Sequence, residues 1–447
     1  MRSILYMRLV LPVVLTIFCT TAISAANDSI RRFPEQRLLD KSVAQTKVIV
    51  VNSKGDRELT MKEDSVRSII YNFYMSQYRH TLDPQAPYFM FISKDANFAL
   101  GVGGLVRMRG WFDWNNSIDA NGFSPALIQI PPDPSARRRL SATPAGTGLF
   151  ITLIGRNTPL GNIKAYIEAN FNGYQHIDFK LKKAYITVGD WTAGYATTTF
   201  SDPAAEPITI DGSGANGVAS KSTVLVRYFH TFKSGFSLAG AFEFPASQIQ
   251  EVNNETKACA DYIPDLVALA QFQWNEGMSH LRIAGLYRNL AYRNLLTGTN
   301  HNIPAWGGLF SAIIKILPRL SISGEFNYGR GIGSYIGDFA VMNSDLVPIA
   351  GKPGVLKAPV VIGGAVGLKY NFADNIYADL VYGRAQYSYK EHSPSDYRYG
   401  NYGAVNLFWN ITPRFMVGAE YLIGNRVNFD GSHGPANRVD ALFSFTF

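Results

Sequence analysis

From residue 90 to the end of the chain, hydrophobic and polar residues alternate with period two, in segments separated by turn residues. In 164–171, for example, the polar residues Lys164, Glu168 and Asn170 share one face, and the other face is apolar throughout. Tilted strands of about 9–11 residues with one lipid-facing side cross a membrane as a closed barrel. The pattern therefore predicts an all-β fold, a transmembrane antiparallel β-barrel over residues 90–447.

The alternation recurs in about sixteen segments, an even number within the range of bacterial barrels. They are 98–114, 148–156, 161–171, 177–188, 191–200, 221–232, 236–245, 265–274, 280–288, 306–317, 320–329, 361–370, 376–386, 400–411, 415–425 and 438–447. Tight connections such as 412–414 alternate with mostly long ones such as 115–147, 289–305 and 426–437. Short periplasmic turns and longer external loops produce this alternation, whereas a soluble double sheet, the main alternative, does not predict it. Aromatic residues near strand ends, including Trp111, Trp191 and Trp409, suit the interfacial belts of such a barrel.

The N-terminal residues 1–26 resemble a secretory signal peptide, because two arginines precede an apolar run and a small-residue stretch. A membrane anchor is the alternative, but the run at 9–19 is too short to span a bilayer. Residues 27–89 form a predicted periplasmic extension. In it, 47–52 is a candidate strand, and Thr60 with Glu63 makes a capping box for an amphipathic helix over about 61–78. That helix packs on its own small domain, joins subunits or plugs the barrel.

Composition supports an exported membrane barrel and excludes other classes. Only 17% of residues are charged and 47% are hydrophobic, so the chain is not disordered. Of the two cysteines, Cys19 is lost with the signal peptide, which leaves Cys259 without an internal disulfide partner. None of the seven histidines lies in a nucleophile motif, and no nucleotide-binding or metal-spacing motif is present. We therefore expect no enzyme activity, no cofactor, no metal and no nucleic-acid partner.

The polar face of the strands predicts a basic lumen. In the first six strands, alternation turns a set of cations inward against the acids Asp113, Glu168 and Asp178. The set comprises Arg107, Arg109, Lys164, Lys180, Lys182 and Arg227, and Arg282 faces inward from a later strand. Cations that line a pore lower the barrier to anions, and the planar fork of arginine suits carboxylates. In the later strands, alternation also turns acids inward, and we expect these charges mainly to pair with one another and brace the wall. The inward acids are Glu243, Glu325, Asp379, Glu420 and Asp440.

The loop near 200–220 is rich in glycine, proline and small residues and contains Asp202, Glu206 and Asp211. A loop of this composition folds compactly enough to enter a barrel. Because it follows the most basic strands, we expect it to constrict the pore, with an ordinary surface loop as the alternative.

Several segments in a fixed order resemble the DcaP-like trimeric porins of bacterial outer membranes. They are 98–113, 161–173, 179–189, 194–202, 212–217 and 226–228. The resemblance implies a homotrimer of barrels with about sixteen strands, and uptake of dicarboxylates or other small organic anions. By motif position, it implies a basic lining of Arg107, Lys180, Lys182 and Arg227. A nonselective diffusion porin and a non-conducting structural or adhesive barrel remain alternatives.

The expected location is the bacterial outer membrane, with the lipid bilayer and small anionic solutes as partners. The chain ends in an alternating apolar segment and Phe447, which is typical of a signal for the barrel assembly machinery.

Overall fold

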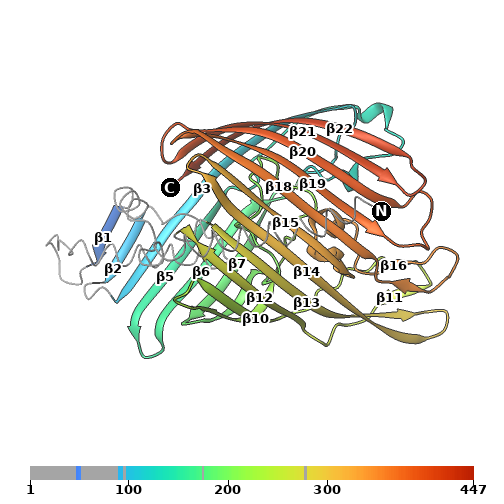
Figure 1. Ribbon diagram of the computed structural model, residues 1–447, viewed down its shortest axis with the longest axis horizontal. Helices are drawn as coiled ribbons and strands as arrows, with labels where there is room; N and C mark the ends of the chain where they lie inside the picture. The colour runs from blue at the N-terminus through green and yellow to red at the C-terminus, as the bar shows by residue number, and fades with distance from the viewer. Residues whose placement is uncertain (1–46, 52–88, 94–96, 174–175, 276–278) are drawn as a thin grey trace, which may run out of the picture.

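The computed structural model describes residues 47–51, 89–93, 97–173, 176–275 and 279–447. Sixteen antiparallel strands form a closed barrel (Figure 1), which confirms the predicted fold class. Its strands are β3 (Phe98–Trp114), β5 (Gly148–Thr158), β6 (Gly161–Asn172), β7 (Asp178–Val188), β8 (Trp191–Thr197), β9 (Ser222–Thr231), β10 (Phe236–Glu243), β12 (Asp265–Trp274), β13 (Ser279–Asn294), β14 (Thr299–Leu317), β15 (Leu320–Arg330), β18 (Val360–Ala373), β19 (Ile376–Ser388), β20 (Tyr397–Asn410), β21 (Phe415–Asn428) and β22 (His433–Thr446). β22 pairs with β3, with Arg438 opposite Asp113, and this pairing closes the wall.

The two faces of the wall differ as the alternation predicts. On β3, Val106 and Met108 are 53% and 54% exposed on the outer face, while Arg109 and Asp113 are buried inside. Closure satisfies the backbone hydrogen bonds of every strand, which lipid requires. The apolar outer side chains then face the hydrocarbon without any unpaired backbone N–H or C=O group beside them.

Two expected loops are largely strand. β13 and β14 continue through 289–305 and leave only the turn 295–298, and β21 and β22 likewise extend through most of 426–437. Beyond the bilayer both faces of a hairpin meet water, so the apolar alternation ends while backbone pairing continues. Polar side chains then pair across the hairpin, as in the Arg293 Nη1 hydrogen bond to Asn300 Oδ1 at 2.9 Å.

Short elements belong to the connections on the long-loop side. They are η1 (Pro125–Leu127), η2 (Pro134–Ala136), β4 (Arg138–Thr143), β11 (Thr256–Ala258), η4 (Gly333–Tyr335), α4 (Gly337–Ala340), β16 (Val347–Pro348) and β17 (Leu356–Lys357). β4 pairs with the end of β3 that lies nearer the long loops, and β5 pairs with the other end of β3. The wall at this point is therefore continued by a strand of the first loop.

The described part of the N-terminal extension adds to the barrel wall. β2 (Phe89–Ser93) pairs with β3 just beyond the end of β22, and β1 (Lys47–Val51) pairs in parallel with β2 (Figure 1). The candidate strand at 47–52 is thus present. The predicted signal peptide at 1–26 and the predicted helix at 61–78 lie outside the described residues. Within the described ranges, no helix has the length and apolarity needed to span a bilayer.

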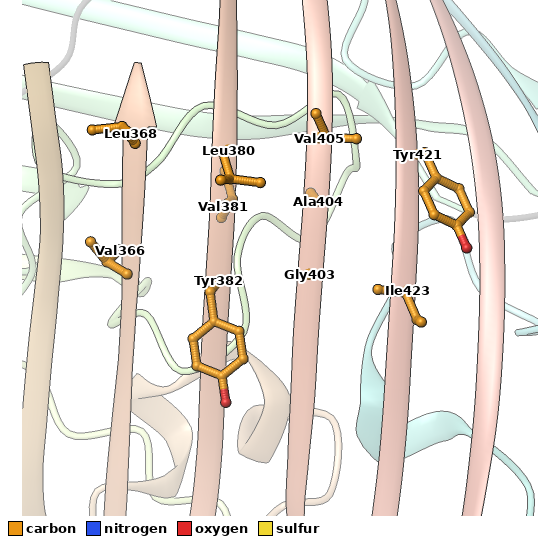
Figure 2. A pocket seen from close by; sticks show the side chains of 10 residues that line it. All are labelled: Val366, Leu368, Leu380, Val381, Tyr382, Gly403, Ala404, Val405, Tyr421 and Ile423. Carbon is orange, nitrogen blue, oxygen red and sulfur yellow. The ribbon is translucent and has the colours of Figure 1, made fainter. Parts of the chain in front are cut away.

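Aromatic residues of the outer face include Trp191 and Trp409, which are 57% and 46% exposed. Trp111 differs from the expectation of a belt residue, because it is buried on the inner face. Outside the barrel, an apolar hollow of about 460 Å³ crosses β18–β21 (Figure 2). Gly403 contributes no side chain at its centre, and Tyr421 and Ile423 border it on β21 (Figure 2).

The hydrophobic core lies inside the barrel. Phe123 and Ile128 of the first loop, together with Val218 of the loop between β8 and β9, pack on wall residues that include Tyr402 and Leu422. A second cluster joins Phe200, Tyr335 and Phe339 from two loops to β18–β20 and β9–β14. Three inward-folding connections therefore fill much of the lumen beside β9–β21.

Candidate functional site

The loop between β8 and β9, residues 198–221, is held inside the barrel by hydrogen bonds from its backbone N–H groups to the barrel wall. Four carboxylates that project inward from the wall accept hydrogen bonds from its N–H groups. They are Glu243 (from Thr199, 2.6 Å), Asp379 (from Ile208, 3.1 Å), Glu420 (from Ile210 and Asp211, both 2.9 Å) and Glu325 (from Ala219). Because these acids lie on β10, β15, β19 and β21, the loop crosses the lumen. The sequence predicted the inward direction of all four carboxylates, but not this role.

Glycines on the wall let the loop approach β18 and β19. Gly217 has a φ of +85°, and a Cβ built on Gly363 would lie only 2.7 Å from its carbonyl oxygen. A Cβ on Gly383 would lie 2.4 Å from the carbonyl oxygen of Asn216. Backbone packs directly on backbone here, so larger residues at Gly363 or Gly383 would displace the loop.

Asp202 anchors the start of the loop. Its carboxylate lies 2.7 Å from His280 Nε2, 2.6 Å from Ser311 Oγ and 3.3 Å from Arg282 Nη1. Burial opposes its ionisation, but Arg282 and His280 outweigh this effect and hold the pKa of Asp202 well below its usual range. Arg282 is 1% exposed and also donates to Ser201 O at 2.8 Å. Arg282 therefore positions the loop from within the wall.

Asp211 anchors the middle of the loop. Arg109 Nη1 lies 3.2 Å and Arg438 Nη1 lies 3.7 Å from Asp211 Oδ1. Trp111 lies between the two guanidinium groups, at 4.9 and 5.0 Å from its ring centroid, in cation–π contact. Arg438 also binds Asp113 through two contacts of 2.6 and 3.0 Å. Both arginines are buried and serve the junction of wall and loop.

Arg227 also belongs to the buried group. It is fully buried on β9 and donates from Nη1 to Thr197 O at 3.3 Å, next to the start of the loop. Of the seven cations predicted to line the pore, Arg109, Arg227 and Arg282 thus lie behind or against the loop.

The other four predicted cations remain accessible on β3, β6 and β7. Lys180 and Lys182 have side chains that are 57% and 50% exposed, and they pair with Asp178 at 3.2 Å and Glu168 at 2.8 Å. Lys164 is half-buried, with Nζ 5.3 Å from the ring of Tyr166. Arg107 is half-buried where wall and loop meet, and its Nη2 donates to Ile210 O at 2.8 Å.

A β-bulge adds a cation that alternation could not predict. Glu168 pairs with Lys183 and Ala169 pairs with Leu181, so Lys182 is an extra residue on β7. Leu181 remains 53% exposed outside, whereas Lys183 is buried inside. The bulge therefore brings adjacent lysines to the inner face, and no local sequence signal marks its position.

One of these accessible cations, Lys182, borders a cavity of about 350 Å³ in the half of the barrel with the tight turns. Its lining includes Lys182, Glu168 and Phe150 from one side and Tyr377, Met416 and Arg414 from the other. The sequence did not single out Arg414, because it lies in a tight turn where strand alternation assigns no direction. The cavity combines basic, aromatic and apolar surface.

Glu206, the third acid predicted for the loop, is placed differently from Asp202 and Asp211. It borders a hollow of about 200 Å³ at the junction of three loops, together with Asp338 and Ser124. Burial raises the pKa of Glu206 to about 7. Burial also raises the pKa of Asp338, although Ser124 and Tyr397 donate hydrogen bonds to its carboxylate.

No protein-family model matches the chain, and no curated protein sequence matches it. Among solved structures, the outer membrane channel DcaP of Acinetobacter baumannii matches with a TM-score of 0.68 and 22% identity, over 80% of this chain and 99% of that one. An anion-selective porin from Comamonas acidovorans matches with a TM-score of 0.54 and 10% identity, over 78% of this chain and 100% of that one. Salmonella typhi OmpF, in a complex with daunomycin, gives 0.52 and 9%, over 78% and 98%.

The similarity to DcaP predicted from the order of the motifs is confirmed at the level of the fold. The chain has the barrel fold of bacterial outer-membrane porins and channels. Together with the apolar outer face, this fold indicates a protein of the bacterial outer membrane.

Proposed function

We propose that the protein is a porin, a passive diffusion channel that favours small organic anions such as dicarboxylates. The observation that carries this proposal is the sorting of the inward cations. One group is buried against the loop, while Arg107, Lys164, Lys180 and Lys182 remain accessible along one wall. A cavity of about 350 Å³ also borders that wall at Lys182 and Glu168.

The proposed path runs between the loop and the wall made by β3, β6 and β7. Arg107 lies where the two meet, and Lys182 and Arg414 border the cavity below. A dicarboxylate that passes there exchanges hydration for two cationic contacts in turn. Glu168 and Asp178 pair with the lysines and weaken the attraction, which keeps binding loose enough for release.

Asp202 and Asp211, with Arg282 and Arg109, hold the constriction in place in this proposal. Arg227 has the same supporting role. These residues determine pore width through the position of the loop, whereas the accessible cations act on the solute directly.

We further propose a homotrimer in which partner subunits cover the outer surface of β7 and β8, where the barrel wall is shortest. β8 has seven residues, which at about 3.3 Å per residue and a tilt near 40° rise roughly 18 Å, less than an apolar band of about 25 Å. The neighbouring Phe179 and Leu181 are exposed apolar residues on the outer face. A subunit packed here would remove the mismatch between the wall and the bilayer.

A non-conducting structural barrel is the second candidate, because loop residues such as Phe123, Phe200 and Tyr335 fill much of the interior. A general-diffusion porin is the third, and it differs only in the charge balance along the path.

Reversal potential in a planar bilayer under a salt gradient separates the three candidates. An anion-selective potential, with current reduced by added succinate, supports the proposal. Conductance without anion preference favours the general-diffusion porin, and folded protein without conductance favours the structural barrel.

A further inference from the structure

The external end of β3 carries an aromatic cluster on the outer face of the barrel. Phe112 and Trp114 stack with ring centroids 6.0 Å apart, and Trp114 stacks on Tyr421 at 5.8 Å. Aromatic rings in such positions mark the boundary between hydrocarbon and lipid headgroups. Since the long loops lie at this end, the boundary belongs to the external leaflet.

β4 places a leucine and an arginine beside this cluster. Leu140 is opposite Phe112 and Arg138 is opposite Trp114 in the antiparallel register. Directly opposed residues share a face of the sheet, so both side chains lie on the outer side. Leu140 is 81% exposed, an unusually high value for a leucine, and lies on the bilayer side of Arg138. Leu140 therefore lies at the depth of the acyl chains, and the positive charge of Arg138 lies farther out, toward the lipid headgroups.

The positive charge of Arg137 and Arg138 is not cancelled nearby. Both residues are exposed, and within the described part of the chain neither forms an ion pair. The acids in this region are otherwise engaged. Asp119 pairs with Arg139, and the Asp133 carboxylate accepts Ser135 N at 2.8 Å and Ser135 Oγ at 2.7 Å.

The aromatic cluster also connects this basic site to the apolar hollow on the outer wall. Tyr421, which stacks on Trp114, borders the hollow across β18–β21 (Figure 2). The remaining lining side chains are aliphatic or the ring of Tyr382. An acyl chain that descends from the aromatic cluster meets a continuous apolar surface with a recess at Gly403.

We propose that Arg137, Arg138, Trp114 and Leu140 form a docking surface for a phosphate-bearing lipid of the external leaflet. The arginines contact the phosphate, and Leu140 and the aromatic face contact the acyl chains. Guanidinium groups suit phosphate because their planar donors match two of its oxygens. Charge complementarity and the order of groups with depth favour such a lipid over a second subunit, which would have to supply acids opposite both arginines.

Native mass spectrometry of the whole protein in neutral detergent tests this proposal. The probes are dioleoyl phosphatidic acid and dioleoyl phosphatidylcholine, which share their acyl chains, and inorganic phosphate alone. We expect phosphatidic acid to bind roughly tenfold or more tightly than phosphatidylcholine, from two juxtamembrane arginines. Inorganic phosphate should compete weakly, because it lacks the apolar contacts.

Variants test whether these residues account for lipid binding. The double variant Arg137→Gln/Arg138→Gln should lose the preference for phosphatidic acid, and Arg137→Lys/Arg138→Lys should keep most of it. Arg319→Gln, at an exposed turn on the opposite rim, is the matched control and should bind as the wild type does. Leu140→Ser should weaken binding of both lipids.

Equal affinity for the two lipids in the wild type would overturn the proposal, as would an unchanged preference in the Gln double variant. Full displacement of phosphatidic acid by inorganic phosphate at similar concentration would show a free-anion site instead. A double variant that changes subunit number but retains lipid preference would identify the surface as a subunit contact. Both results contradict lipid docking.

Discussion

Arg109 on β3 and Asp211 in the loop between β8 and β9 form an ion pair at 3.2 Å, and both side chains are almost fully buried. Removing one partner of a buried pair leaves an unpaired charge and costs about 3–5 kcal/mol. We expect Asp211→Asn to lower the unfolding midpoint of the barrel and to increase noise in single-channel current. Asp119→Asn is the control, because it breaks the exposed pair with Arg139. Similar stability and noise in both variants would contradict the anchoring role of Asp211.

The accessible lysines should control selectivity without controlling stability. In Lys180→Gln/Lys182→Gln, anion preference should fall severalfold, because the path loses two of its cations. The change is read from the reversal potential in a salt gradient. Lys233→Gln removes a lysine from an exposed turn and should leave the potential unchanged. An unaltered potential in the double variant would exclude this wall as the path.

The close contact between Gly363 of the wall and the loop predicts that a larger side chain at this position destabilises the barrel. Gly363→Val should destabilise the barrel by about 1–3 kcal/mol, because its Cβ would lie 2.7 Å from the Gly217 carbonyl oxygen. Gly240→Val is the control, since a Cβ there has open space around it. Unfolding midpoints in denaturant measure the difference. Equal midpoints for the two variants would mean that the loop does not rest on Gly363.

Glu206 predicts a pH dependence of stability. Its folded-state pKa of about 7 lies above the ordinary value of 4.5, so the folded state binds the proton more tightly. This contribution is complete below pH 4.5 and is lost as the pH rises through 7. Between pH 5 and pH 8 the wild type should therefore lose about 2–3 kcal/mol relative to Glu206→Gln. Parallel pH profiles of the unfolding free energy for the two proteins would refute the assignment.

The wall was predictable because lipid imposes a simple rule on every strand. Each outer face must be apolar, so period-two alternation located all sixteen barrel strands and assigned Arg107 and Arg109 inward. The rule ends at the membrane boundary, which explains why β13 and β14 extend beyond their predicted ends. It also fails at the bulge on β7, where Lys183 turns inward beside Lys182.

For the candidate site, the sequence predicted which charged residues face inward but not which of them the loop covers. Alternation places a charge inside the barrel, but it does not say whether a distant loop covers that charge. Arg109 and Lys182 have equivalent sequence signals, yet one is buried against Asp211 and the other is accessible. The burial of Trp111 between two arginines has the same origin, because it depends on Arg438 more than three hundred residues away.

The central claim is that solute passes along the wall that carries Lys182. Current before and after a bulky charged thiol reagent tests it, with cysteine at position 182 in a Cys259→Ser background. Modification of Lys182→Cys should block most of the current. Leu407→Cys, on the outer face of β20 and away from the proposed subunit contact, should conduct unchanged. Labelled Lys182→Cys protein that conducts as well as labelled Leu407→Cys protein would contradict the account.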